Sequence, residues 1–325
     1  MAFRQIEIPT LGRRLSGVMA HPSSAADADT HKLALDEYRR LGGNCIHLHG
    51  EGGERHTRRA AGQWLRSHDR RPEFFLCTQI CHEGWDDTAQ RPLDRFTPEA
   101  VGEDVDSDLE LLGTEYLDLV YLDDRPQAPL EPVIEAIGRE IRRGRVRAFG
   151  FRNWTAERIK AAHAHISREG LPGAAAIVTT ELALASSTGP LWPEYVPFDA
   201  EHEQVVCALR LAVFAHADDV NLGQCLYEDG DAISRMRPHW IERWKHSANP
   251  DLVQRVRRFA ASRGLTPREV NVAWLLNQAF PAVAVVNLPS LPTARRIEYE
   301  RASQLPLEEA DLRWLKVGLT TAANG

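Results

Sequence analysis

Short apolar segments alternate with amphipathic segments along most of this chain. Eight of the segments are apolar for most of their length, as expected of parallel strands that are covered on both faces. They are residues 16–20, 45–49, 74–79, 117–123, 146–151, 175–181, 211–217 and 282–288. The segments between them have helical periodicity. Eight strand-plus-helix units predict an α/β fold, a single (β/α)8 barrel domain spanning residues 1–325.

Helix signals support this division of the chain. Thr97, Thr155 and Thr266 each stand where a helix should begin, and Glu269 completes a possible capping box with Thr266. A doubly wound sheet is the alternative, but no GxGxxG motif follows the first strand. The segments 186–204 and 226–250 are rich in proline, glycine and charge, and we expect them to be long loops.

Composition excludes several classes of protein. The chain has 325 residues and a net charge of −7, which argues against sequence-independent binding of nucleic acid. No apolar run reaches the ~20 residues of a membrane helix, and the first residues lack the apolar core of a secretory signal. The five cysteines suit a reducing compartment. We therefore expect a cytoplasmic protein, monomeric or homo-oligomeric, whose partner is a small-molecule substrate.

Three phrases in order along the chain resemble the aldo-keto reductase superfamily. They are LGTEYLDL at residues 112–119, RGRVRAFGFRNW at residues 143–154, and GLTP with AWLL at residues 264–267 and 273–276. The resemblance runs from about residue 40 to the end of the chain. It implies a (β/α)8 (TIM) barrel of the aldo-keto reductase type and NADP(H)-dependent reduction of carbonyl compounds.

The chain departs from this family at the positions of its catalytic tetrad. Aligned on residues 43–46, His47 stands at the family's aspartate and Gly52 at its proton-donating tyrosine. Gln79 stands at its lysine and Asp123 at its histidine. Hydride addition to a ketone needs a proton donor and positive charge beside the developing alkoxide. Glycine and glutamine supply neither, so we expect ordinary carbonyl reduction to be lost.

The cofactor groove that the resemblance implies is also altered. Asn153 matches the asparagine that holds the nicotinamide amide, but its neighbour is Arg152 instead of serine. Arg296 is the one cation kept in the late phosphate-binding segment. Asp218 and Asp219 fall where the pyrophosphate loop should be, and carboxylates there would oppose an anion unless Arg152 or another cation intervenes. We therefore expect no cofactor; if NADP(H) is retained, Asn153, Arg152 and Arg296 should bind it.

Histidines and carboxylates stand at the carboxyl ends of several predicted strands, where barrel active sites lie. Side chains alternate along a strand, so His47 and His49 should both point inward. Such groups suit proton abstraction and return, as in dehydration, elimination, isomerisation or cyclisation. The predicted function is therefore a divergent aldo-keto reductase-like enzyme of specialised metabolism, a lyase or isomerase with repurposed acid–base chemistry. The candidate catalytic residues are His47, His49, Gln79, Asp123, Glu181 and His216.

Other interpretations of these residues stay open. The polar groups could be simple hydrogen-bonded pairs in a non-catalytic binding or regulatory barrel, or the protein could be an NADP(H)-dependent oxidoreductase with an atypical site. His47-x-His49 with an aspartate from another strand also occurs in metal-dependent hydrolases. The surrounding phrases match the reductases instead, and we expect no metal. Trp192, Trp240 and Trp244 lie in the predicted long loops and are candidates to bind an apolar or ring-shaped substrate.

Overall fold

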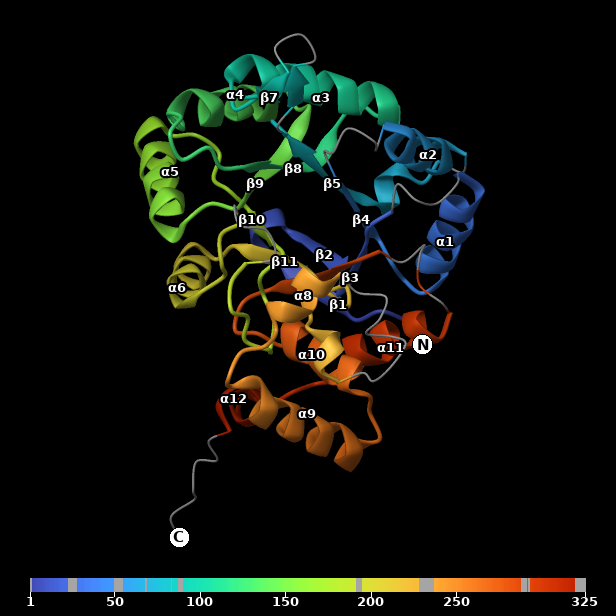
Figure 1. The fold of residues 1–325 in the computed structure, drawn as a ribbon. Coiled ribbons are helices and arrows are strands. Elements are labelled where there is room, and N and C mark those ends of the chain that lie inside the picture. The colour runs from blue at the N-terminus through green and yellow to red at the C-terminus, as the bar shows by residue number, and fades with distance from the viewer. Residues whose placement is uncertain are drawn as a thin grey trace.

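A closed barrel of parallel strands forms the centre of the protein (Figure 1). The structure is a computed structural model, and it describes residues 2–22, 28–49, 55–67, 69–82, 84–86, 90–190, 195–227, 237–287, 291 and 293–318. Around the barrel the strands follow the order β10-β11-β12-β3-β4-β5-β8-β9, and every neighbouring pair is parallel. This confirms the predicted (β/α)8 fold of the aldo-keto reductase type.

The eight barrel strands coincide with the eight apolar segments to within two residues at each end. They are β3 (Val18–Ala20), β4 (Cys45–Leu48), β5 (Phe75–Ile80), β8 (Leu117–Asp123), β9 (Val146–Arg152), β10 (Ala176–Thr179), β11 (Ala212–His216) and β12 (Ala282–Val286). Nearly all of their residues are buried, because helices cover the outer surface and side chains fill the interior. The apolar runs therefore located the strands directly.

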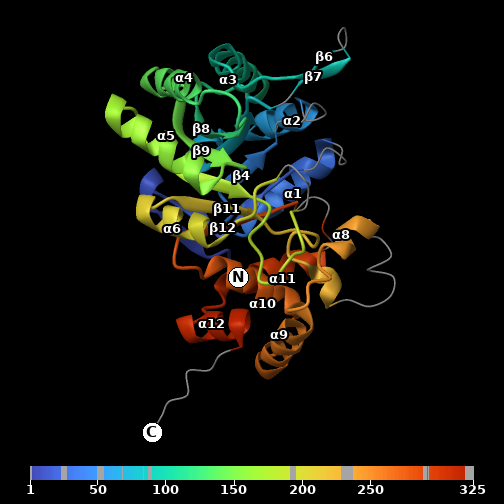
Figure 2. The same cartoon turned by 60° about the vertical axis from the view of Figure 1, so that its left-hand side comes forward.

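Helices surround the barrel in the order in which the chain connects the strands (Figures 1 and 2). They are α1 (Ala28–Arg40), α2 (Arg55–Arg66), α3 (Pro98–Leu112), α4 (Glu131–Arg142), α5 (Ala156–Glu169), α6 (Ala200–Leu209), α8 (Pro238–Glu242), α9 (Asn249–Arg263), α10 (Pro267–Leu276), α11 (Thr293–Gln304) and α12 (Glu309–Val317). The expected long loops are partly wrong, because α6 begins within 186–204 and α8 and the start of α9 lie within 226–250.

The predicted helix starts are confirmed by the cap geometry. The Thr97 hydroxyl accepts a hydrogen bond from the Ala100 amide, and Thr155 caps α5 in the same way. Thr266 and Glu269 form the complete capping box at α10. These side chains satisfy amide groups that the first turn of a helix leaves without partners.

A hairpin closes the amino-terminal end of the barrel. Strands β1 (Gln5–Ile8) and β2 (Arg13–Ser16) pair antiparallel, and the Thr10 hydroxyl between them donates to the carbonyl of Ala175. Ile8 and Leu15 are fully buried and pack on the apolar interior of the barrel. A functional site inside the barrel is therefore approached from the carboxyl ends of the strands. A second short hairpin, β6 (Gly84–Asp86) and β7 (Arg91–Leu93), follows β5.

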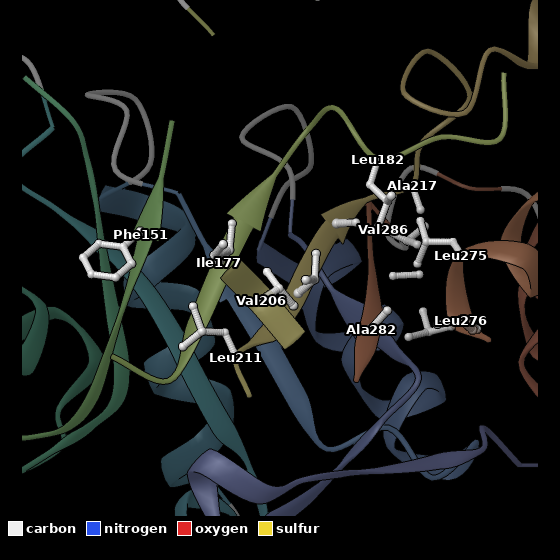
Figure 3. Close-up of a cluster of buried hydrophobic side chains, with 14 of the residues drawn as sticks. Phe151, Ile177, Leu182, Val206, Leu211, Ala217, Leu275, Leu276, Ala282 and Val286 are labelled. Carbon is white, nitrogen blue, oxygen red and sulfur yellow. The ribbon is translucent and has the colours of Figure 1, made fainter. Parts of the chain in front are cut away.

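The main hydrophobic core lies between the strands and the helices that cover them. Figure 3 shows one part of it, where Ile177 of β10 and Leu211 before β11 lie near Val206 of α6, and Ala282 and Val286 lie near Leu275 and Leu276 of α10. Close packing in this core holds the strand ends rigid, so the polar side chains at those ends are held in fixed positions.

Close packing between α2 and α3 gives a first testable prediction. A Cβ atom added to Gly62 of α2 would lie 2.4 Å from the Leu112 carbonyl oxygen at the end of α3, while one added to Gly102 of α3 would meet nothing within 4 Å. We expect Gly62→Ala to lower the free energy of unfolding by about 2–3 kcal/mol, and Gly102→Ala to raise it by about 0.5–1 kcal/mol through helix propensity. Urea denaturation measures both; equal effects would contradict this packing.

Candidate active site

The polar side chains at the barrel mouth come from neighbouring strands. His47 is on β4, Gln79 on β5, Asp123 on β8, Arg152 on β9 and His216 on β11, each near the carboxyl end of its strand. Asp123 and Arg152 are register partners, while His47 is opposite Cys77 and Gln79 is opposite Tyr121, each two residues before the next member of the group. The side chains of the site form two connected groups.

The first group of side chains is centred on Asp123. Its carboxylate accepts hydrogen bonds from Gln79 Nε2 at 2.8 Å and from Asn153 Nδ2 at 3.1 Å, and it forms an ion pair with Arg152 at 3.2 Å. On its other side Gln79 Oε1 lies 3.0 Å from His49 Nδ1. Because Gln79 donates to Asp123 through its amide nitrogen, its oxygen is the acceptor, and His49 carries its proton on Nδ1.

A tyrosine that the sequence analysis missed completes this group. Arg152 Nη2 donates a 2.7 Å hydrogen bond to the hydroxyl oxygen of Tyr195, and the guanidinium lies 4.9 Å from the centre of the tyrosine ring. Arg152 is 3% exposed. Burial acts to lower the pKa of Arg152, but Asp123 and Tyr195 raise it above its ordinary value, so the side chain stays charged. The five residues His49, Gln79, Asp123, Arg152 and Tyr195 are called the polar network below.

Four imidazoles form the second group, called the histidine cluster: His21, His47, His49 and His216. Their ring centres are 5.1–5.8 Å apart in all six pairs. His47 also stacks on Tyr121, at 5.1 Å between ring centres. Burial lowers the pKa of His21 to about 4, and it lowers the pKa of each of the other three well below 6.5. All four rings are therefore uncharged at neutral pH.

The inward orientation expected for His47 and His49 is what the structure has. His21 was not predicted, because the first apolar run ends at Ala20. The signal was present in the alternation of the strand: the Met19 side chain belongs to the barrel interior, and His21 is two residues further along the same face.

The main contact of the Glu181 carboxylate is with a residue outside the polar network. Its carboxylate instead lies 2.8 Å from Arg243, with both side chains almost fully buried. The Arg243 carbonyl accepts hydrogen bonds from the amide and hydroxyl of Thr188. The pair therefore fastens the loop after β10 to the segment after α8.

The tryptophan candidates divide into three cases. Trp244 is 2% exposed, and its indole donates to the carbonyl of Val220, so it packs inside the fold, and its role in substrate binding stays a prediction that these contacts do not support. Trp240 is half-buried on α8 and remains a prediction. Trp192 lies outside the described residues.

The charge of the predicted phosphate region differs from our expectation. Asp219 lies 2.9 Å from Arg268 and 3.8 Å from Arg295, so two guanidinium groups balance its carboxylate. Both arginines also pair with Glu298, at 2.8 and 3.9 Å, so they are the intervening cations but are shared between two carboxylates. Nearby on α11, Arg296 pairs with Glu37 and donates to the Thr293 hydroxyl at 3.3 Å. Its buried Nε has no hydrogen-bond partner among the described residues.

The fold and the site together define a (β/α)8-barrel protein whose polar centre lies at the carboxyl ends of its strands. Comparison with known proteins is consistent with that class: the profile of the Aldo/keto reductase family matches residues 44–178. Over this segment, which is less than half of the chain, and over the parts matched by the relatives described next, the chain is similar to aldo-keto reductases.

Two curated relatives show how far the chain has diverged. Aldo-keto reductase yakc [NADP(+)] of Schizosaccharomyces pombe is 24% identical over 260 residues, which cover 73% of this chain and 66% of the relative. Aldo-keto reductase str7 of Strobilurus tenacellus is 25% identical over 268 residues, covering 78% of this chain and 68% of the relative. The chain thus spans about two thirds of the length of these relatives.

The expectation that the protein works without a cofactor is contradicted by these comparisons. The matching family is one of reductases, and the relative from S. pombe carries NADP(+) in its name.

Two further features concern only the described part of the chain. Its helices include none long and apolar enough to cross a membrane. It also holds no group of three or more His, Cys, Asp or Glu side chains in a metal-binding arrangement.

Proposed function

We propose that the protein is an NADP(H)-dependent oxidoreductase that interconverts a small carbonyl compound and its alcohol, with Tyr195 as the proton donor. The single observation that supports this most strongly is the 2.7 Å hydrogen bond from Arg152 to the Tyr195 hydroxyl oxygen. Gly52 and Gln79 had indicated that no phenol and no cation remain in the site. Tyr195 and Arg152 bring both to it from other positions.

Side chains at the start of α11 fit the negative charge of a phosphate group of NADP(H). Arg296 and Thr293 at the start of α11 offer a guanidinium and a hydroxyl to a phosphate, and the unpartnered Nε of Arg296 has a donor to spare. Asn153 remains at the position that the resemblance assigns to the nicotinamide amide. When bound, NADP(H) supplies or accepts the hydride.

Each member of the polar network has a definite task in this proposal. The Tyr195 hydroxyl oxygen accepts from Arg152, and the phenol keeps its own O–H, which is the proton it would donate to the oxygen of a substrate. Arg152 then stabilises the phenolate that remains, which regains a proton from solvent because Tyr195 is only partly buried. Asp123 holds the guanidinium in place. Tyr195 is thus the catalytic residue, while Arg152 and Asp123 position and stabilise it.

The same geometry argues against Asp123 as a free general base in a lyase or isomerase. Its oxygens already accept from Gln79 and Asn153 and face Arg152. To take a proton from a substrate, this carboxylate would have to give up one of these contacts. Non-reductive chemistry is therefore the second candidate, supported by the neutral histidine cluster.

Binding of NADPH tests the proposed function directly. Fluorescence titration of the full chain should give a Kd for NADPH on the order of micromolar. Arg296→Leu should weaken NADPH binding about tenfold, because it removes one charge contact of modest strength with a phosphate. Arg168→Leu is the matched control, because it removes the same charge from an exposed position on α5. Absence of NADPH binding would overturn the proposal, and substrate conversion without NADPH oxidation would favour the lyase or isomerase.

A further inference from the structure

The His202 ring, on the first turn of α6, faces one acceptor from each of its nitrogens. Its Nε2 lies 3.0 Å from the Trp154 carbonyl oxygen, and its Nδ1 lies 2.8 Å from Asp199 Oδ1. A carbonyl oxygen and an ionised carboxylate both accept and never donate, so each ring nitrogen carries a proton. The contacts therefore define His202 as an imidazolium, in contrast to the neutral rings of the histidine cluster.

Asp199 is ionised in this arrangement. It is the N-cap of α6, where its carboxylate accepts from the amides of Glu201 and His202. Burial acts to raise the pKa of Asp199, but the ring and the amide of His202 lower it below its ordinary value. The ion pair thus balances the charge of a ring whose side chain is 6% exposed.

His202 connects the two chain segments that meet at Tyr195. Trp154, whose carbonyl accepts from the ring, is two residues after Arg152, and Asp199 is four residues after Tyr195. Arg152 joins the same two segments through its 2.7 Å hydrogen bond to the Tyr195 hydroxyl oxygen. Two cross-links therefore hold the segment that carries Tyr195 against the end of β9.

The chain between Tyr195 and Asp199 is short and packed. Pro197 restricts the backbone at its centre. The Phe198 ring lies 5.7 Å from the His202 ring, measured between ring centres. A shift of Asp199 would therefore displace the Tyr195 side chain.

Charged groups on neighbouring elements also act on this ring. Besides Asp199 they are two carboxylates on the first turn of α6, an ammonium on α12 and a guanidinium on α5. The ammonium donates to two carbonyls in the loop after β10, and the guanidinium is paired with Asp124 at 2.8 Å. The carboxylates favour a charged ring. These groups belong to Glu201, Glu203, Lys316 and Arg158.

We propose that His202 is a positioning residue for Tyr195: its imidazolium joins Trp154 to Asp199 and so holds the Tyr195 hydroxyl beside Arg152. This inference rests on the proposed function of Tyr195 as the proton donor. A neutral ring can donate to only one of its two acceptors, so the link is complete only while the ring is charged. His202 therefore makes the reaction sensitive to pH.

Nitrogen-15 NMR of the full chain tests the charge of His202 without an assay of activity. The signal of His202 is identified by its absence from His202→Gln. We expect it to show protons on both ring nitrogens at about pH 6. A neutral ring at this pH would overturn the proposal.

The pH profile of reduction of benzaldehyde by NADPH tests the role of the charge. In the unmodified protein kcat should fall as the pH rises through the range in which histidines titrate, about pH 5–8. His202→Gln should lose this fall, lower kcat about 10- to 100-fold at the low end of the range, and leave the Kd for NADPH unchanged.

A second variant does not depend on replacing a buried side chain. Asp199→Asn keeps an N-cap on α6 and should move the fall in kcat to lower pH, because the ring loses the carboxylate that stabilises its charge. Glu201→Gln is the matched control, since it removes an exposed carboxylate from the same turn, and it should leave the fall in place.

The double variant Tyr195→Phe/His202→Gln separates this role from the proposed function. If His202 acts through Tyr195, His202→Gln should lower kcat no further in the Tyr195→Phe background. An equal loss in both backgrounds, or an unchanged kcat and pH profile in His202→Gln, would overturn the positioning role alone. Equal kcat of Tyr195→Phe and the unmodified protein would instead overturn the proposed function, and this role with it.

Discussion

We expect Tyr195→Phe to lower kcat/KM for NADPH-dependent carbonyl reduction by about 100- to 1,000-fold, the usual cost of removing one hydrogen-bond donor to a developing oxyanion. The variant keeps the ring that lies beside Arg152 and loses only the hydroxyl. The loss should fall on kcat, and the Kd for NADPH should be unchanged. Steady-state kinetics together with fluorescence titration separate these two quantities.

The chain offers a matched control at the opposite end of the barrel. Tyr116 lies just before β8, with Arg71 and Arg147 at 3.9 and 3.7 Å from its ring centre. Tyr116→Phe therefore removes a phenol beside arginine without touching the proposed site, and its kcat should equal that of the unmodified protein. Equal activity of all three proteins would exclude Tyr195 as the proton donor.

Variants of Arg152 distinguish positioning from a merely structural role. Arg152→Met should reduce kcat strongly and leave KM nearly unchanged, because the phenolate loses its stabilising charge. Arg152→Lys should recover part of the rate, because it restores the cation but not the two-sided contact with Asp123 and Tyr195. A lysine variant no better than the methionine variant would argue that Arg152 serves folding alone.

The second large effect concerns stability. We expect Glu181→Gln to lower the free energy of unfolding by about 3–5 kcal/mol, because it leaves the charge of Arg243 buried without its partner. Both side chains are at most 6% exposed, and their ion pair measures 2.8 Å. Denaturant titration followed by tryptophan fluorescence measures the change.

An exposed ion pair provides the comparison for Glu181. Glu169 pairs with Arg168 at 3.0 Å, with side chains 47% and 64% exposed. Exposed pairs contribute about 0–1 kcal/mol, so Glu169→Gln should change stability little. If Glu181→Gln were equally mild but abolished catalysis, Glu181 would have the catalytic role that the sequence predicted and the structure does not support.

The barrel could be predicted from the sequence because the patterns that indicate its strands and helices are local. Parallel strands buried on both faces appear as continuous apolar runs, and threonine caps mark the helix starts within a few residues. The inward direction of His47 follows from the same two-residue period. Such features depend on neighbouring residues and need no knowledge of the folded chain.

The parts of the site that escaped prediction depend on distant residues or on irregular segments. Tyr195 meets Arg152 across 43 residues, from a loop that has no periodicity to place its side chain. Arg268 pairs with Asp219 across 49 residues, a contact that no local pattern in the sequence indicates. The absence of the ordinary tetrad, which Gln79 and Gly52 indicate, stays a prediction, because Gly52 lies outside the described residues; no local pattern showed which groups lie beside Asp123.

A crystal structure of the protein with NADP+ and an unreactive carbonyl inhibitor tests the central claim most directly. We predict that the inhibitor oxygen lies within hydrogen-bond distance, about 2.6–3.2 Å, of the Tyr195 hydroxyl, with Arg152 still bound to that hydroxyl. An inhibitor oxygen bound by His47, by Gln79 or by water alone, with Tyr195 turned away from it, would contradict the assignment of Tyr195 as the proton donor.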